Sequence, residues 1–294
     1  MHNMIDLHIH SKYSDDGEHE PAVLVKQCFE KSINVMSITD HNCVKANALA
    51  ESAAQKIGIR YIPGIEIDCT FQGINFHVLG YGIDYRSPDF KEIEDNIEVQ
   101  SLSASFERLE LTQTLGFRIT DAEMWAISKT TCKPGTWSGE MFAEVLLKKQ
   151  EYMNNPILQP YRSGGARSDN PFVNFYWDFY SQGKPCYVKM KYPSIEETIS
   201  VIHANQGIAV LAHPGVNLKG NFGLIDEIIK CGIDGIEVFS SYHTPPEIEY
   251  FYKKALEKKL CMTCGSDYHG KTKPTIKIGE HGCFLSECEL MSLN

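Results

Sequence analysis

Two histidines near the start of the chain have the spacing of metal ligands. Apolar and polar residues alternate over Met4–Ile9 as in a short strand, so the imidazoles of His8 and of the following His10 face the same side. Neutral imidazole suits zinc, iron and other first-row metals. The following loop supplies Asp16, directly before a glycine. Two surface histidines on an edge strand would show the same pattern, so more distant residues must decide between the two interpretations.

Further imidazoles and carboxylates follow at or near the ends of later predicted strands. Each has an ordinary alternative, such as a helix N-cap or a solvated loop residue, but with His8 and His10 included, six of the eleven histidines fall at strand ends. His8, His10 and the seven later candidates make nine, which exceeds the roughly four ligands that one zinc ion takes, so we expect two or three metals sharing a carboxylate. The candidates beyond the first strand and its loop are Asp40, His41, Glu66, His77, His213, Asp267 and His269.

The elements that must position these side chains alternate between strand and helix. Buried strand patterns are expected at 34–39, 59–67, 75–80, 208–212, 235–239 and 260–265. Helical patterns are expected at 21–31, 44–57, 194–206, 224–231 and 246–258. This alternation predicts a mainly parallel α/β fold, in which sites form at the carboxyl ends of the strands.

The middle of the chain differs in character. Residues 89–115, 120–127, 138–149 and 172–180 are predicted to be helical, and 151–171 form a loop rich in Pro, Gly, Ser and Asn. We therefore expect a discontinuous catalytic unit over 1–85 and 191–294, interrupted at 86–190 by an inserted, mainly helical subdomain that covers the substrate.

Composition limits the possible partners. The 294 residues are 43% hydrophobic and carry a formal net charge of −10, which disfavours binding to a long nucleic acid. No signal pattern or membrane-length apolar run occurs, so a cytoplasmic location is expected. The ten cysteines are scattered, many in apolar elements, and the Cys261/Cys264 pair is interpreted as core packing.

Taken together, the motifs resemble the PHP (polymerase and histidinol phosphatase) family of metal-dependent phosphoesterases. The resemblance covers residues 4–85 and 190–285 and implies a distorted (β/α)7 barrel with a trinuclear site and a nucleophilic hydroxide bridging two metals. The matching motifs are His8-x-His10, Asp16-Gly17, Thr39-Asp40-His41, Pro63-Gly64-Ile65-Glu66, His77, Ala212-His213-Pro214 and Gly265-Ser266-Asp267-x-His269.

The resemblance also implies how the ligands are shared. His8, His10, Glu66 and Asp267 would surround one metal. Glu66 would bridge to a second metal held by His77 and His213, and Asp16, His41 and His269 would bind a third. Asp15 is a weaker candidate than Asp16, and Asp40 is expected to orient a histidine. Manganese, iron and zinc all accept such ligands. His243 is the expected phosphate contact or proton donor, with a loop histidine as its alternative.

The insert resembles that of the branch that dephosphorylates nucleotides or trims short RNA from its 5′ end. That branch carries Arg-Pro-His at the start of an insert helix, where this chain has residues 135–140, so a cation and an imidazole are missing. Arg162 and Arg167 could replace the charge, or could simply lie in a solvated loop; Lys189 and Lys191 are weaker phosphate-binding candidates.

Three hypotheses about function remain open. The first is a phosphoesterase for a nucleotide or short oligonucleotide, favoured if Trp137, Tyr161 and Trp177 stack a base rather than fill the insert core. The second is a phosphatase for histidinol phosphate or a sugar phosphate. The third is a non-catalytic metal-binding accessory module, which would not need an open polynuclear site.

Overall fold

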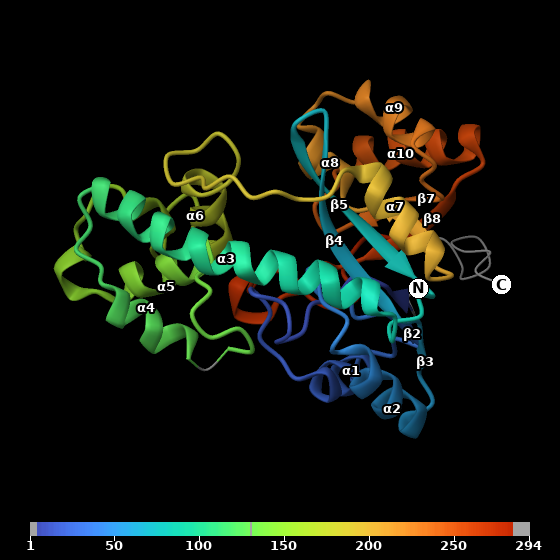
Figure 1. Ribbon diagram of the computed structural model, residues 1–294, viewed down its shortest axis with the longest axis horizontal. Helices are drawn as coiled ribbons and strands as arrows, with labels where there is room; N and C mark the ends of the chain where they lie inside the picture. The colour runs from blue at the N-terminus through green and yellow to red at the C-terminus, as the bar shows by residue number, and fades with distance from the viewer. Residues whose placement is uncertain (1–4, 130, 285–294) are drawn as a thin grey trace.

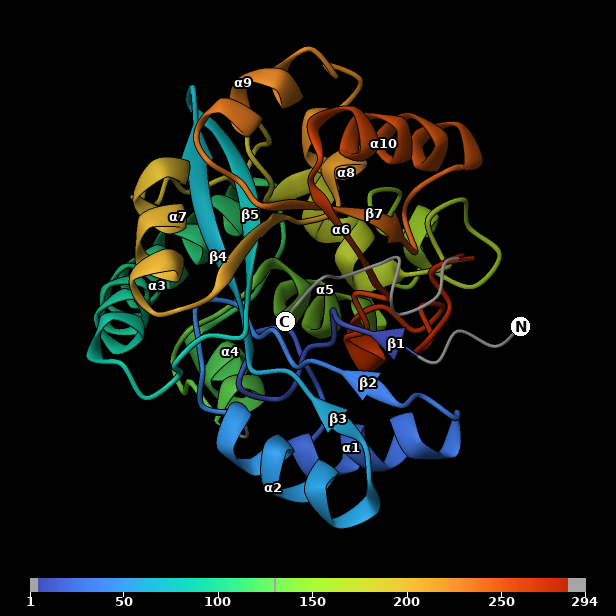
Figure 2. The same ribbon diagram turned by 90° about the vertical axis from the view of Figure 1, so that its right-hand side faces the viewer.

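The computed structural model describes residues 5–129 and 131–284, so Met4 of the predicted first strand and the C-terminal end of the predicted unit lie outside the described residues. Its strands form two sheets (Figure 2). The first is parallel and contains β1 (Ile5–Asp6), β2 (Val35–Met36) and β3 (Arg60–Tyr61). The second, in this order, contains β4 (Gly64–Phe71), β5 (Ile74–Tyr81), β6 (Ile208–Leu211), β7 (Gly235–Ser240) and β8 (Cys261–Gly265).

Isolated backbone hydrogen bonds join the two sheets at both sides. Next to β1, the Leu7 amide donates to the Cys264 carbonyl and the Asp267 amide donates to the His8 carbonyl. On the other side, His41 pairs with Glu66 in a parallel bridge beyond the end of β2. The strands therefore surround a common centre without forming one continuous closed sheet, which agrees with the expected distorted α/β barrel.

One strand, β5, departs from the expected parallel order, because it runs antiparallel to both of its neighbours, β4 and β6. The expected strand over 59–67 is two strands, β3 and β4, separated around Pro63, and β4 turns back into β5 as an antiparallel hairpin. Gln72 and Gly73 form its turn with φ values of 50° and 78°. Positive φ at both central residues is typical of the tight hairpin turn that matches the twist of the strands. A two-residue connection leaves no room for a crossover helix.

Helices cover the outside of the strands (Figure 2). Their bounds agree closely with the helical patterns in the sequence, and Ser194 caps its helix with the expected capping box. No helix among the described residues has the length and apolar character needed to cross a bilayer. The helices of this part are α1 (Pro21–Glu30), α2 (Asn47–Ile57), α7 (Ile195–Ala204), α8 (Pro214–Leu218), α9 (Leu224–Lys230) and α10 (Pro245–Lys258), with the 3-10 turn η3 at Gly270–Thr272.

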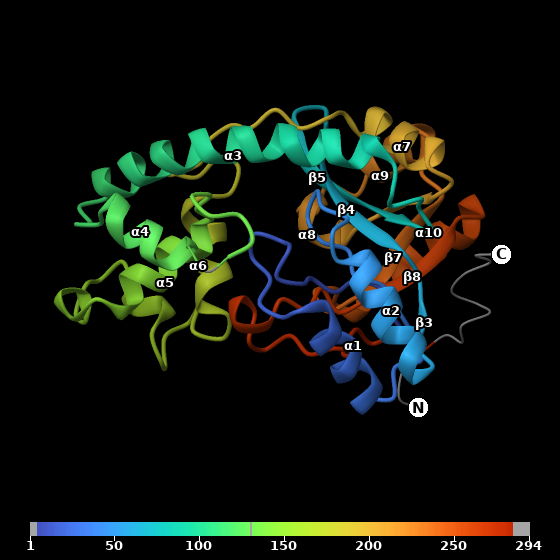
Figure 3. The same cartoon turned by 60° about the horizontal axis from the view of Figure 1, so that its bottom comes forward.

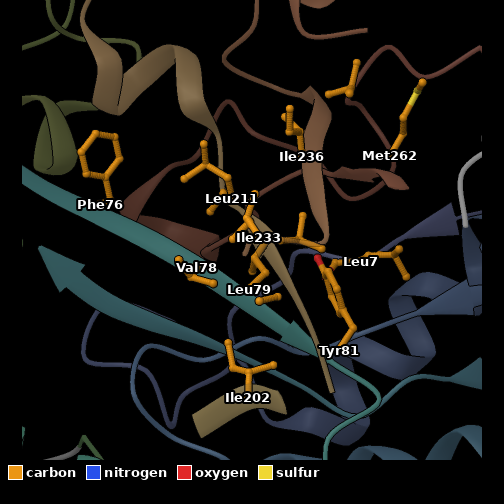
Figure 4. Packing of buried hydrophobic residues seen from close by; sticks show 14 of the residues in the cluster. Leu7, Phe76, Val78, Leu79, Tyr81, Ile202, Leu211, Ile233, Ile236 and Met262 are labelled. Atoms are coloured by element: carbon orange, nitrogen blue, oxygen red, sulfur yellow. The ribbon is translucent and has the colours of Figure 1, made fainter. Parts of the chain in front are cut away.

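Apolar side chains between strands and helices form the main core (Figure 4). The alternation in the first strand separates two faces: Leu7 and Ile9 enter hydrophobic clusters, whereas His8 and His10 face the centre. Both sets are fully buried. The burial of apolar residues on one side of the strands therefore fixes where the imidazoles point on the other.

Residues 88–186 add a second group of elements beside the strands (Figures 1 and 3). The 27-residue helix α3 (Pro88–Thr114) starts in the main core at Phe90 and reaches a separate apolar cluster at Leu109. That cluster is built around residues such as Trp137 and Phe142. The extent of the inserted subdomain stays a prediction. The remaining elements are α4 (Asp121–Ser128), α5 (Gly139–Lys148), α6 (Pro171–Phe179) and the 3-10 turns η1 (Gln150–Tyr152) and η2 (Gln159–Tyr161).

The close approach of β8 to the first strand yields a prediction. A Cβ at Gly265 would lie 2.1 Å from the His8 Cβ and 2.7 Å from Glu237 Oε1. Gly265→Ala should therefore displace both groups, lower the free energy of unfolding by about 1–3 kcal/mol and weaken metal binding. Thermal denaturation and metal titration measure the two effects. Gly223→Ala is the control, because only the Asn221 side chain lies within 4 Å of its Cβ; equal behaviour of both variants would contradict the prediction.

Candidate metal centre

Four side chains converge on one point at the centre of the strands. Their ligand atoms lie within 4.8 Å of one another, and all four residues are buried. His8 Nε2 lies 3.1 Å from His10 Nε2 and 3.1 Å from Glu66 Oε2. Asp267 Oδ1 lies 3.2 Å from His8 Nε2 and 3.0 Å from His10 Nε2, and His10 Nε2 lies 3.1 Å from Glu66 Oε2.

These separations fit a metal ion. Ligands held about 2.0–2.1 Å from a tetrahedral zinc are roughly 3.3 Å apart, close to the 3.0–3.2 Å found here. When His8 Nδ1 donates to Glu237, the neutral ring turns the lone pair of its Nε2 toward His10 Nε2 and toward the Glu66 carboxylate. A cation between them satisfies both nitrogens, so the His8/His10/Glu66/Asp267 set has the chemistry of a metal site.

The second carboxylate oxygen of Glu66 serves another pair of histidines. Glu66 Oε1 lies 2.9 Å from His77 Nδ1 and 3.0 Å from His213 Nε2. Glu66 therefore has the geometry of the bridging ligand that the resemblance implies. The ligand atoms of Glu66 and His77 also form a compact group with His41, whose Nδ1 is 3.4 Å from Glu66 Oε2.

A third group lies at the loop after the first strand. It contains Asp16, His41 and His269, together with His10, and its ligand atoms lie within 4.8 Å of one another. His269 Nε2 is 2.9 Å from Asp16 Oδ2. The structure thus brings all nine expected ligands into adjoining groups, in which His10, His41 and Glu66 are shared.

In three of the histidines, the ring nitrogen that points away from the ligand cluster lies close to a hydrogen-bond acceptor. His8 Nδ1 lies 2.9 Å from Glu237 Oε1. Asn217 Oδ1 is 2.8 Å from the Nδ1 of His213 and the Asp267 carbonyl is 2.8 Å from the Nδ1 of His269. Such contacts fix the tautomer and orientation of a ligating imidazole. Glu237 lies within the expected strand over 235–239, but its role cannot be predicted from the sequence, because a buried acid on a β-strand has no signal that distinguishes it from a solvated one.

Asp68 is another participant that the sequence analysis missed. It lies directly opposite His77 in the antiparallel register of β4 and β5, and its Oδ1 is 3.2 Å from His77 Nε2 and 3.4 Å from His41 Nδ1. Asn42 donates to its other oxygen at 2.8 Å. The sequence does contain a sign that Asp68 lies near Glu66, since residues 66 and 68 share one face of a strand. The assignment of a strand alone does not reveal that β5 pairs with it.

Asp267 is fixed by two donors on its other oxygen. The Tyr242 hydroxyl and the Lys273 ammonium each donate to Oδ2 at 2.6 Å. Burial alone would raise the pKa of Asp267, but the charges of Lys273 and His269 outweigh it and hold that pKa well below its usual value. Asp267 also has a left-handed backbone with φ of 57°. Strain of this kind persists where the surroundings fix a conformation, often at functional sites.

The electrostatics of the centre favour ionised carboxylates. Burial would raise the pKa of Glu66, but His8, His41 and the neighbouring imidazoles lower it well below its usual value. Burial and the nearby His269 lower the pKa of His10 to about 4, so its ring is neutral near pH 7. Burial would lower the pKa values of His8 and His41, but the surrounding carboxylates raise them, so a metal bound there would displace protons from these two rings.

Asp40 borders the centre through the backbone. Its Oδ1 accepts from the Ser11 amide at 2.5 Å and its Oδ2 from the Ser11 hydroxyl at 2.6 Å. Asp40 therefore holds the chain directly after His10 rather than contacting an imidazole through these bonds. Asp15, the weaker ligand candidate, lines a cleft beside Asp16.

His243 and the two loop arginines make other contacts. His243 Nδ1 lies 2.9 Å from the Val238 carbonyl, and its Nε2 accepts from the Gly215 amide at 3.1 Å, so neither ring nitrogen is available to a phosphate in this arrangement. Arg162 donates to the carbonyls of residues 147 and 152, and Arg167 pairs with Asp178. These side chains stabilise loops. Lys189 and Lys191 are exposed on the segment that returns from α6.

Of the three aromatic residues considered for base stacking, two lie in an apolar core and one lies near the candidate metal centre. Trp137 and Tyr161 are buried in the second apolar cluster, so for these two residues the structure agrees with the alternative that they fill the insert core. Trp177 of α6 is half-buried, and its ring lies 5.9 Å from that of Tyr242, the residue bonded to Asp267. Trp177 is therefore the member of this set that borders the metal centre.

A cleft of about 580 Å³ opens beside Asp16. Its walls come from Asp15–Gly17, α4, α5 and Lys271–Thr272. Glu140, at the start of α5, lies on this wall, where burial and the charge of Asp16 raise its pKa to about 8. Lys271 crosses from the strand unit to Glu144 of α5 at 2.8 Å. The cleft thus lies between the candidate metal centre and the helices α4 and α5.

Comparison with known proteins agrees with this geometry. Residues 6–159, just over half of the chain, match the model of the PHP domain. The chain belongs to the PHP domain family. It is 25% identical over 90% of its length, and 94% of the other chain, to a phosphoribosyl 1,2-cyclic phosphate 1,2-diphosphodiesterase from Eggerthella lenta.

Other PHP relatives are phosphoesterases as well. A 3′,5′-nucleoside bisphosphate phosphatase from Chromobacterium violaceum is 28% identical over 90% of this chain and 87% of its own. The crystal structure of a metal-dependent phosphoesterase from Bifidobacterium adolescentis superposes with a TM-score of 0.72 at 25% identity, covering 94% of this chain and 91% of that one. This PHP protein is accordingly a hydrolase of the metal-dependent phosphoesterase type.

The contact between Glu237 and His8 leads to a prediction about metal binding at the candidate centre. Glu237→Gln retains size but places an amide where one carboxylate oxygen accepts from His8 Nδ1 or from the His213 amide. His8 then loses its preferred tautomer, and we expect metal affinity to fall by about 10- to 100-fold. Isothermal titration with Mn²⁺ measures this. Glu249→Gln, an exposed acid on α10 paired with Lys253, is the matched control; unchanged affinity in Glu237→Gln would refute the positioning role.

Proposed function

We propose that the protein hydrolyses a phosphate ester of a nucleotide or short oligonucleotide with two or three divalent metals, manganese, iron or zinc, held by the nine-residue cluster. The observation that carries the proposal is the convergence of four ligand atoms from His8, His10, Glu66 and Asp267 at 3.0–3.2 Å. When bound, such metals supply positive charge to the phosphoryl oxygens and lower the pKa of an attacking water. We place this activity in the cytoplasm as a prediction.

The chain's own residues prepare this site. Glu237 holds His8, Asp68 holds His77, and Lys273 with Tyr242 holds Asp267. These contacts keep the ligand atoms in place before substrate arrives, which reduces the reorganisation needed during the reaction.

The nucleotide class is supported by the aromatic border and by the relatives. Trp177 and Tyr242 lie side by side at the edge of the centre, where a base could stack. The Chromobacterium relative acts on a nucleoside bisphosphate and the Eggerthella relative on a phosphoribosyl cyclic phosphate. A simple sugar phosphate would leave the Trp177 face without an aromatic partner.

A substrate panel tests the proposal. With added Mn²⁺, we expect phosphate release from AMP, adenosine 3′,5′-bisphosphate or a dinucleotide to exceed release from histidinol phosphate. Preference for histidinol phosphate would refute the nucleotide assignment. No turnover of any substrate by metal-loaded protein would instead support the accessory-module alternative.

A ligand substitution tests the metal cluster itself. His41→Gln should lower kcat by at least about 100-fold, because His41 belongs to two of the candidate ligand groups. The control is His203→Gln on the exposed face of α7, where His203 pairs with Asp234. Similar Tm values for the two variants exclude unfolding as the cause. Full turnover in His41→Gln would contradict its assignment as a ligand.

A further inference from the structure

Arg108 differs from Arg167 of the insert in what surrounds its guanidinium. It lies half-buried on α3, and its Nη1 donates to the Trp137 carbonyl at 3.1 Å. Its Nη2 points to the Met190 sulfur at 3.7 Å. No carboxylate in the described part of the chain forms an ion pair with it, whereas Arg167 is paired with Asp178. Arg108 therefore brings a fixed positive charge and unused donors into a partly enclosed place.

A second donor converges on the same weak acceptor. The Tyr192 hydroxyl donates to the Met190 sulfur at 3.5 Å. A thioether sulfur is a poor acceptor, so neither Tyr192 nor Arg108 gains a strong hydrogen bond from it. Both donors are half-buried and would gain from an anion that replaces the sulfur as their acceptor.

The backbone places these donors beside the metal centre. Thr70 of β4 forms a parallel bridge with Ser194, and the Thr70 amide donates to the Pro193 carbonyl at 2.9 Å. Two residues back in the same register, Tyr192 comes beside Asp68, which contacts His41 and His77. Burial and the charge of Asp68 raise the pKa of Tyr192, while Arg108 opposes them, in agreement with this placement.

Neighbouring groups at this place leave room for negative charge. Asp68 is already surrounded by the His41 and His77 rings and by the Asn42 amide. Burial and the charges of Glu140 and Asp68 raise the pKa of Tyr176 on α6, while Arg108 lowers it. The Tyr176 hydroxyl therefore stays protonated and is a further donor on this side.

We propose that Arg108 and Tyr192, with Tyr176 beside them, bind a second phosphate group of the substrate next to the metal centre. The planar guanidinium can hold a phosphate through two parallel hydrogen bonds, which a lysine cannot do. The proposal rests on the proposed phosphoesterase activity and narrows its substrates to esters that carry two phosphates. In this proposal Arg108 of α3 supplies the positive charge that the Arg-Pro-His element supplies in related proteins and that residues 135–140 of this chain lack.

The test compares a substrate with two phosphates and one with a single phosphate. We expect Arg108→Met to lower the ratio of kcat/KM for adenosine 3′,5′-bisphosphate to that for AMP by about 10- to 100-fold. Tyr192→Phe, which removes only a hydroxyl, should lower the ratio less. Arg118→Met is the control, because Arg118 is exposed on the same insert. An unchanged ratio in both Arg108→Met and Tyr192→Phe would overturn the subsite.

A binding measurement separates this proposal from the activity itself. Adenosine 3′,5′-bisphosphate is titrated into metal-depleted wild-type, Arg108→Met and Tyr192→Phe proteins, and Tm is recorded for each. Weaker binding by folded variants supports the subsite even if the wild type hydrolyses no nucleotide, an outcome that would refute only the proposed function. Equal affinity in the three proteins would overturn the subsite even if turnover is observed.

Discussion

The buried carboxylate of Glu66 is the constraint on which the structure depends. Burying a charge is costly unless it is paired, and Glu66 is completely buried. One of its oxygens faces His8, His10 and His41, and the other faces His77 and His213. These five imidazoles come from four separate places in the chain, so the strands must meet around Glu66 for its charge to be compensated.

Much of this centre could be predicted because it follows from local rules. Alternation in a short strand places His8 and His10 on one face, and strand ends in an α/β fold gather Asp267 and His213. The helices were predictable from their apolar periodicity and caps, as at Ser194. The antiparallel β4–β5 hairpin was missed because its turn, Gln72–Gly73, is a weak sequence signal compared with Asn-Gly.

The groups that support the centre could not be predicted, because they meet it only through tertiary contacts. Lys273 reaches Asp267 from a loop, and Glu237 reaches His8 from a strand more than two hundred residues away. The expected phosphate-binding Arg162 is instead bonded to backbone carbonyls, whereas Arg108 on a polar helix drew no attention. A charged side chain in a sequence does not show whether its partner is already present in the fold.

The central claim is that the buried imidazoles and carboxylates are a metal centre. Anomalous diffraction at the manganese absorption edge, from crystals grown with Mn²⁺, tests it most directly. The account predicts a strong peak between His8, His10, Glu66 and Asp267, with further density at the adjoining groups around His77 and His269. A map with no peak among these side chains, in crystals whose protein retains its fold, would contradict the account.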